Sequence, residues 1–282
     1  MKQENLFVTD LDGTLFHSNV TVSEYTTMTI NKLINAGYYI TFCTARSYYM
    51  ARKIMNKINF NVPCIVFNGA YIIDCMTGEK LVANSLQKSL CIEVLEDAKK
   101  IGIVPFVFGQ EKDEEVLKYV LPENKGQKNF IMQRKKQKDK RLRFVNKIEL
   151  PDEIITLNFI EKESQLRKLK KICEKKYENL LSIKFAEDIY LKGFFSLELS
   201  NHNADKGKMI KVLAKYMDIP LQNVVVFGDH LNDLTMFKVA GRTIAVKNAH
   251  REILNFADEH IASNNEDGVA RYLENNLLNK FL

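Results

Sequence analysis

The strongest constraint on the fold is a short, largely apolar run that leads directly into two aspartates. Residues 6–9 form this run, and it is followed at once by Asp10-Leu11-Asp12-Gly13-Thr14. A run of this length bounded by turn residues is typical of a buried strand. Burying two carboxylates at the end of a strand is costly without a positive partner, so we favour a functional loop over an ordinary Asp/Gly turn. Such a pair suits a hard cation, or a nucleophile beside an acid/base group.

Strand-like and helix-like segments alternate in the first 84 residues and again after residue 200. After the first run, the expected elements are helices at 23–36 and 47–58, strands at 39–43 and 64–67, and a hairpin formed by 70–73 and 80–83. In the last part they are helices at 206–216, 231–238, 251–256 and about 267–278, and strands at 223–227, 242–246 and 259–262. This order predicts an α/β fold, a parallel sheet with helices on its faces.

The middle of the chain has a different pattern. Helical segments at 88–101 and 163–178 are expected to alternate with strands at 103–108, 154–160 and 195–199. We therefore expect one α/β domain built from residues 1–84 and 200–282, with residues 85–199 inserted as a second domain. An insertion is tolerated where its two ends lie close together.

Composition excludes several classes of protein. No stretch approaches the roughly 18 consecutive apolar residues of a membrane span, and the first residues do not form a signal peptide, so we expect a cytoplasmic protein. The odd number of cysteines and the lack of a C-x-x-C pair predict reduced core thiols; they are Cys43, Cys64, Cys75, Cys91 and Cys173. The net charge is 41 − 35 = +6. The basic stretch 133–141 is interpreted as a solvated loop or an exposed helix face, with a surface that attracts anions as the alternative. Without interleaved aromatics it gives little support to nucleic-acid binding.

A second acidic loop, residues 228–233, follows the apolar run 223–227. Asp229 and Asp233 are four residues apart, so both could face one side of an early helical turn. With Asp10 they would place three carboxylates around one point, which requires a cation, and Mg²⁺ is the expected one. The alternative is that Asp229 caps the helix and Asp233 complements its dipole. For Asp233, a direct metal ligand and a supporting position are equally compatible with the sequence.

Positive charge and hydrogen-bond donors come from two further segments. Thr44 follows the strand at 39–43, and Lys206 begins the helix at 206–216. A hydroxyl and an ammonium are groups that bind an anion, although Thr44 could instead cap a helix and Lys206 could be a solvent lysine. Arg46 is interpreted as a surface residue in the first helical turn. Because each segment falls at the end of a predicted strand or the start of a helix, we expect one shared site.

These motifs resemble those of the haloacid-dehalogenase-like (HAD) hydrolase superfamily, and the late segments 245–249 and 265–270 resemble its Cof-type phosphatase branch. The resemblance covers nearly the whole chain in order and spacing. It implies a Rossmann-like parallel-sheet core domain with an inserted α/β cap domain that sets substrate specificity. It also implies an Mg²⁺-dependent phosphatase that hydrolyses a small-molecule phosphate ester, with neither nucleic acid nor membrane as a partner.

The resemblance also implies a role for each site residue. Asp10 would attack phosphorus and form an aspartyl-phosphate, and Asp12 would act as the acid/base group. Mg²⁺ would be held by Asp10, the carbonyl of Asp12, and Asp229, with support from Asp233. The phosphoryl oxygens would be held by Thr44, Lys206, Asn232 and the backbone around Leu11 and Gly13.

At two positions the chain differs from the residues that are usual in the Cof-type branch. Two alternative functions also remain open. The branch usually has Thr-Gly-Arg at 44–46, where this chain has Ala45, and it often has Ser or Asn in place of Asp205. A phosphomutase of the same fold, or a phosphate-binding regulatory module without turnover, would share the motifs. The sequence names neither the substrate nor the oligomeric state.

Overall fold

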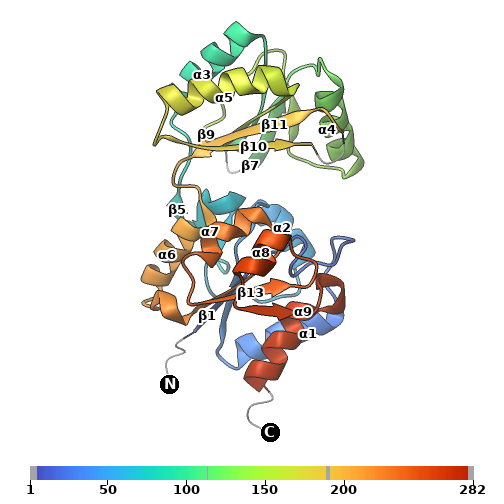
Figure 1. The fold of residues 1–282 in the computed structure, drawn as a ribbon, viewed down its shortest axis with the longest axis vertical. Coiled ribbons are helices and arrows are strands. Elements are labelled where there is room, and N and C mark those ends of the chain that lie inside the picture. Colours follow the sequence, from blue (N-terminus) through green and yellow to red (C-terminus); the bar gives the residue numbers. More distant parts are fainter. Residues whose placement is uncertain (1–4, 113, 189–190, 279–282) are drawn as a thin grey trace. The chain divides into compact units, whose positions relative to one another are not determined.

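The computed structural model describes residues 5–112, 114–188 and 191–278. The chain divides into two compact units, Met1–Ala83 with Asn203–Leu282 and Asn84–His202. The first unit therefore combines the two ends of the sequence, and the second is a continuous insertion (Figure 1). The role of the second unit as a substrate-specificity cap stays a prediction.

The first unit contains a five-stranded parallel sheet, as predicted. Its strands are β1 (Leu6–Thr9), β2 (Tyr39–Phe42), β12 (Val224–Gly228), β13 (Arg242–Val246) and β14 (Glu259–Ile261), in the order β14-β13-β12-β1-β2. β1 pairs with β12 on one side and with β2 on the other, both in parallel. The carboxyl ends of these three strands therefore lie next to each other, although they come from distant parts of the sequence.

The apolar composition of the central strands explains their position. Every residue of β1 and of β12 is buried, and runs of β-branched and aromatic residues buried on both faces are typical of parallel strands. The helices of this unit are α1 (Glu24–Asn35), α2 (Tyr48–Ile54), α6 (Lys206–Tyr216), α7 (Leu234–Phe237), α8 (Arg251–Phe256) and α9 (Gly268–Leu273). α1 packs against α9 and α6 packs against α7.

Four predicted elements of this unit differ from the structure, and two of them lie in the first part of the chain. β3 (Cys64–Val66) was expected in the parallel sheet, but it joins β4 (Tyr71–Ile73) and β5 (Lys80–Ala83) in a separate antiparallel sheet. An isolated parallel bridge between Cys43 and Ile65 connects it to the end of β2, because the chain turns back directly after three residues. The helix expected at 47–58 ends at Ile54, since the following turn buries both Met55 and Ile58.

The two remaining differences lie at helices near the end of the chain. The segment expected as one helix at 231–238 is a 3₁₀ turn, η3 (Leu231–Asp233), followed by α7. The closing helix is α9, which continues as the π-helical turn Glu274–Leu278. Both segments are helical where the sequence predicts a helix, but neither forms a single regular α-helix.

The second unit contains a six-stranded mixed sheet in the order β10-β11-β9-β6-β7-β8. The strands are β6 (Pro105–Glu111), β7 (Glu114–Tyr119), β8 (Leu142–Phe144), β9 (Glu153–Glu161), β10 (Leu181–Glu187) and β11 (Phe195–Asn201). All neighbours pair antiparallel except β7 and β8. α3 (Lys88–Ile101) packs against α5 (Glu163–Lys176), and their apolar residues share one core cluster with the sheet.

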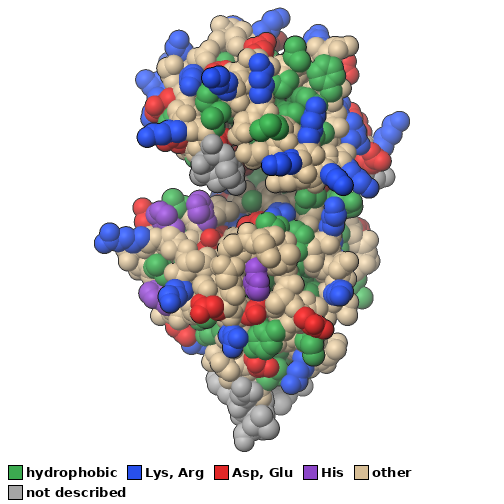
Figure 2. All heavy atoms as spheres, turned by 90° about the vertical axis from the view of Figure 1, so that its right-hand side faces the viewer, with side chains coloured by type: hydrophobic (Ala, Val, Ile, Leu, Met, Phe, Trp, Pro, Cys, Tyr) green, Lys and Arg blue, Asp and Glu red, His purple; other side chains and the backbone are tan. Residues whose placement is uncertain are grey.

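The basic stretch 133–141 is only partly solvated. Its first residues end α4 (Lys125–Lys136), a helix that the sequence did not predict. Arg141, however, is buried, and its Nε and Nη2 donate to the two carboxylate oxygens of Asp139 at 2.9 and 2.8 Å. The prediction of a solvated stretch was therefore wrong at Asp139 and Arg141, which are both buried and neutralise each other. On the face in Figure 2, Lys and Arg side chains are spread among acidic ones.

The five cysteines are free and buried, which confirms the prediction of reduced core thiols. Among the described residues, no helix has the length and apolar character that a membrane crossing requires.

Candidate active site

The site begins at the carboxyl end of β1. The Asp10 amide donates to the Phe227 carbonyl at 2.9 Å, and the Cys43 amide donates to the Thr9 carbonyl at 2.9 Å. These bonds continue the sheet pairing beyond the strand, so they fix the backbone on both sides of Asp10. The Asp10 residue itself is only 5% exposed.

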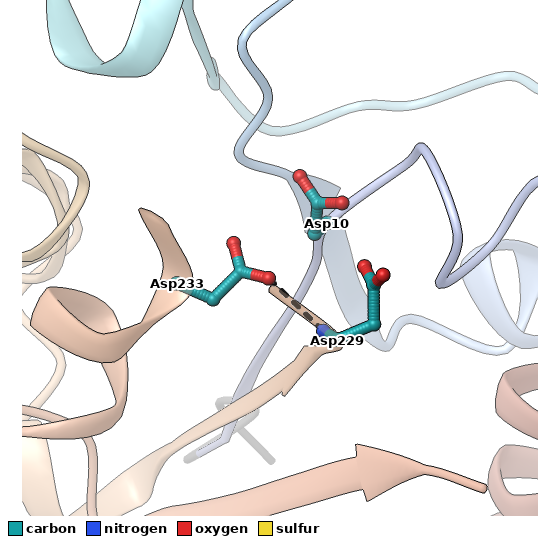
Figure 3. Close-up of side chains that lie close together, drawn as sticks. All are labelled: Asp10, Asp229 and Asp233. Carbon is teal, nitrogen blue, oxygen red and sulfur yellow. Dashed lines mark hydrogen bonds between the residues drawn. The ribbon is translucent and has the colours of Figure 1, made fainter. Parts of the chain in front are cut away.

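Three carboxylates gather at this edge of the sheet. Asp10 follows β1, Asp229 follows β12, and Asp233 lies in η3. One carboxylate oxygen of each lies within 4.8 Å of those of the other two. Figure 3 shows the three side chains close together. Strand pairing between β1 and β12 causes this meeting, because it aligns Thr9 with Phe227.

A buried lysine lies between two of these carboxylates. Lys206 is 1% exposed, and its Nζ donates to Asp10 Oδ1 and to Asp233 Oδ1, both at 2.6 Å. Lys206 is the first residue of α6, and the Asp205 side chain caps that helix by accepting from the Lys208 amide. Asp205, the departure from the family pattern, therefore serves as a helix cap.

The cluster holds more negative than positive charge. Burial lowers the pKa of Lys206, but Asp10 and Asp233 more than offset this, so its pKa lies above the usual value. Burial raises the pKa of Asp10 well above its usual range; Lys206 opposes this increase, and the other two carboxylates add to it. Burial likewise raises the pKa of Asp229 to about 6. Three acids facing one lysine leave charge that a divalent cation would balance.

The two acidic residues of the second loop make different contacts. Asp233 uses both oxygens within the protein: Oδ1 accepts from Lys206, and Oδ2 accepts from the amides of Asp229 and His230, each at 3.0 Å. Asp229 accepts from the Thr14 hydroxyl at 2.8 Å. Of the two interpretations that the sequence left open for Asp233, these contacts favour a supporting position.

Gly13 is required by the close approach of Asp229. Its φ is +79°, and a Cβ atom at this position would lie 2.4 Å from Asp229 Oδ2. The Gly13 carbonyl also accepts from the Asn248 side chain at 2.7 Å. Asn248 belongs to the late segment 245–249, so this segment holds the loop that carries Asp10 and Asp12.

Replacement of Gly13 by Ala is expected to remove most of the activity. The new methyl group would push Asp229 away and would also impose a side chain on a left-handed backbone, which typically costs about 1–2 kcal/mol. We expect at least a roughly 100-fold loss of the phosphatase activity that the family resemblance implies, because a displacement of about 1 Å can cost that much. Gly78→Ala is the matched control, since Gly78 also has positive φ (+77°) but has open space around the added methyl. Equal activity of both variants would contradict the role of close packing at Gly13.

Asp12 and Arg46 form a pair that the sequence did not predict. Asp12 is exposed, and its two carboxylate oxygens accept from Nε and Nη2 of Arg46, both at 2.6 Å. The Arg46 guanidinium also lies over the Phe16 ring, 5.4 Å from its centroid. The interpretation of Arg46 as an ordinary surface residue was therefore wrong. Its place beside Thr44, after β2, was the available signal, because it put Arg46 at the same sheet edge as Asp12.

The remaining predicted residues surround the same edge. Leu11 is fully buried, and Thr44 is 1% exposed and follows β2. The helix after Thr44 is capped by Ser47 rather than by Thr44, which leaves the capping alternative for Thr44 without support. Asn232 lies in η3, and its Nδ2 donates to Asn68 Oδ1 at 3.2 Å. Asn68 was not predicted, since it lies within a short turn after β3.

The chain is similar to known phosphatases over almost its full length. A family model described as haloacid dehalogenase-like hydrolase matches residues 7–273. Phosphatase YwpJ of Bacillus subtilis is 26% identical over 95% of this chain and 98% of its own. The 5-amino-6-(5-phospho-D-ribitylamino)uracil phosphatase YitU of the same organism is 24% identical over 95% and 96%. A haloacid dehalogenase-like hydrolase structure from Bacteroides thetaiotaomicron has a TM-score of 0.80 at 22% identity, covering 98% of this chain and all of that one, which supports the fold.

Proposed function

The chain belongs to the haloacid dehalogenase-like hydrolase family as a phosphatase of phosphate monoesters, and we propose that it hydrolyses small phosphorylated metabolites with Mg²⁺ through an aspartyl-phosphate. The observation that carries this proposal is the buried contact of Asp10 with Lys206, at 2.6 Å, beside Asp229. A nucleophilic carboxylate must approach an anionic phosphate, and only a site with cations permits this.

The donor set fits a hard divalent cation. Asp10 and Asp229 supply carboxylate oxygens, and the main-chain carbonyl of Asp12 would complete the protein ligands, as the family resemblance implies. Oxygen donors with room for retained waters suit Mg²⁺. Asp233 would hold Lys206 and the loop of Asp229. When bound, the metal supplies positive charge that offsets repulsion between the attacking carboxylate and the phosphate.

The proposed chemistry has two steps. In the first, an Asp10 oxygen forms a bond to phosphorus while the bond to the leaving alcohol breaks, and Asp12 gives that alcohol a proton. In the second, Asp12 takes a proton from water, the water oxygen bonds to phosphorus, and Asp10 is released. Because Arg46 holds both Asp12 oxygens in this structure, Asp12 must leave Arg46 at least in part to reach the leaving group.

The phosphoryl oxygens require fixed donors throughout both steps. Lys206, Thr44 and Asn232 are the side chains proposed for this role, with backbone amides around Leu11 and Gly13. Their positions are set by the sheet edge and by α6 rather than by the substrate, so they are preorganised. Turnover would therefore depend mainly on positioning and charge.

Sugar phosphates and phosphorylated cofactors are the proposed substrates. The relative YitU is named for a phosphorylated ribityl compound joined to a pyrimidine, which belongs to this group. A phosphate-release screen over such compounds with Mg²⁺ tests the proposal. We expect free phosphate from at least one of them. Conversion to an isomer without phosphate release would indicate a phosphomutase, and binding without turnover would indicate a regulatory module.

Metal binding should depend on pH in a defined direction. Since the pKa of Asp229 is about 6 in the metal-free protein, protons compete with Mg²⁺ below that pH. At about pH 5 only about a tenth of this carboxylate is ionised, so Mg²⁺ should bind about tenfold more weakly than at about pH 7.5. We expect Mg²⁺ to raise the midpoint temperature of thermal unfolding (the thermal midpoint) clearly at the higher pH and much less at the lower one.

The same raised pKa predicts the behaviour of the metal-free protein. A folded pKa above the unfolded one gives stability that is present at low pH and is lost as the pH rises through about 6. EDTA should therefore stop turnover and lower the midpoint most above that pH, and Mg²⁺ should restore both. Asp229→Asn is the control, because it should abolish the effect of Mg²⁺ on the midpoint. Hydrolysis that continues fully in EDTA would contradict the metal requirement.

A further inference from the structure

The turn after β3 has an unusual backbone. Phe67, Asn68 and Gly69 have φ values of +51°, +54° and +101°, so three successive residues are left-handed. Non-glycine residues rarely adopt this conformation, and each one costs on the order of 1 kcal/mol or more. Such strain persists only where surrounding contacts enforce it, and it is frequent at ligand-binding sites.

Two backbone hydrogen bonds attach this turn to the segment after β2. The Asn68 amide donates to the Thr44 carbonyl, and the Phe67 amide donates to the Arg46 carbonyl, both at 2.9 Å. The left-handed conformation aims these successive amides at the neighbouring loop. The turn therefore lies directly against two residues of the site, one proposed to hold phosphate and the other bound to Asp12.

The same turn contacts the two other elements that carry proposed phosphate ligands. Asn68 Oδ1 accepts from Asn232 Nδ2 at 3.2 Å. At Gly69, an added Cβ would lie 2.6 Å from the backbone nitrogen and oxygen of Asp205, the residue that caps α6 before Lys206. One tripeptide thus touches the segments of Thr44, Asn232 and Lys206, which are far apart in the sequence.

We propose that Asn68 is a positioning residue for phosphate binding and acts through Asn232. The side-chain oxygen of Asn68 accepts one N–H of the Asn232 side-chain amide. This bond fixes the plane of that amide and leaves its other N–H for a phosphoryl oxygen. The left-handed turn places Asn68 for this task, and Gly69 lets α6 approach closely. This inference rests on the proposed function, since it assigns a role within the same site.

The test uses a variant that keeps the backbone and removes only the side chain. Asn68→Gly suits this purpose, because glycine adopts positive φ without strain. Asn179→Gly is the matched control, since Asn179 is also left-handed (φ +65°) and is an exposed residue of the second unit. The probes are p-nitrophenyl phosphate as substrate and inorganic phosphate as a competing product, both with Mg²⁺.

We expect Asn68→Gly to raise both the KM and the inhibition constant of phosphate about tenfold, the size of effect that follows from losing one oriented hydrogen bond to a charged group. The kcat should stay within about threefold, because a contact made equally in ground and transition states affects KM alone. If the turn had only a structural role, Asn68→Gly would lower the midpoint of thermal unfolding without raising KM and the inhibition constant at a nearly constant kcat. Asn179→Gly should leave all three constants unchanged.

A double variant then tests whether Asn68 acts through Asn232. If it does, Asn232→Ala combined with Asn68→Gly should bind phosphate no more weakly than Asn232→Ala alone, because the two residues form one unit. Effects that add in full, or an unchanged inhibition constant in Asn68→Gly, would overturn the inference. An inactive wild-type protein, or full activity in Asp10→Asn, would overturn the proposed function instead, so the two failures are distinguishable.

Discussion

Replacement of Asp10 by Asn is expected to reduce phosphate release by at least about 10³-fold, because the amide cannot serve as the nucleophile that forms the aspartyl-phosphate. The side chain keeps its shape, and its carbonyl can still accept from Lys206. Folding should therefore be retained. Since the charged form of Asp10 is disfavoured by burial and by its acidic neighbours, the neutral variant should be as stable as the wild type near pH 7, or more stable.

The experiment measures phosphate release and the thermal midpoint of the same preparations. Glu252→Gln is the matched control, because it makes the same chemical change at an exposed carboxylate of α8. It should leave turnover unchanged. An Asp10→Asn variant with wild-type turnover would end the assignment of Asp10 as nucleophile, whereas a variant with a much lower midpoint would show that Asp10 is needed for folding.

The parallel sheet was predictable because its strands carry a strong local signal. The continuous apolar run Val224–Gly228 ends at an acidic loop, and so does Leu6–Thr9. In parallel sheets, ligand sites lie beyond the carboxyl ends of the strands, and this rule predicts that Asp10 and Asp229 meet. The structure brings them together with Lys206, although 196 residues separate Asp10 from that lysine.

Other features depend on contacts that no local pattern reveals. The pairing of Arg46 with Asp12 depends on which way two side chains turn at adjacent strand ends. The left-handed turn at 67–69 depends on hydrogen bonds to a different loop, and in the sequence Asn68-Gly69 looks like any short turn. In the second unit, β7 begins with Glu114 and Glu115 and includes the buried Lys118. Charged residues there hide the alternation that would have indicated a strand.

Replacement of Lys206 by Met is expected to damage both stability and function. Methionine fills a similar volume, but Asp10 and Asp233 lose the cation that each contacts at 2.6 Å. Removing one partner of a buried ion pair costs roughly 3–5 kcal/mol. Phosphate release should fall at least about 100-fold, because a charge that faces the transferring group is lost. Unfolding in urea and phosphate release measure the two effects separately.

The pH dependence of this variant distinguishes charge from packing. Without Lys206 the folded-state pKa of Asp10 must rise further, because Lys206 is the group that opposes its increase. The lost stability should therefore be greatest near pH 8 and smaller near pH 5, where a proton replaces the missing cation. Lys211→Met, on the exposed side of α6, should change stability by no more than about 0.5 kcal/mol. Adding Asp10→Asn to Lys206→Met should restore part of the stability and none of the activity, because it removes one unpaired buried acid. A loss of stability that is equal at all pH values and is not relieved by Asp10→Asn would mean that Lys206 acts by packing rather than by charge.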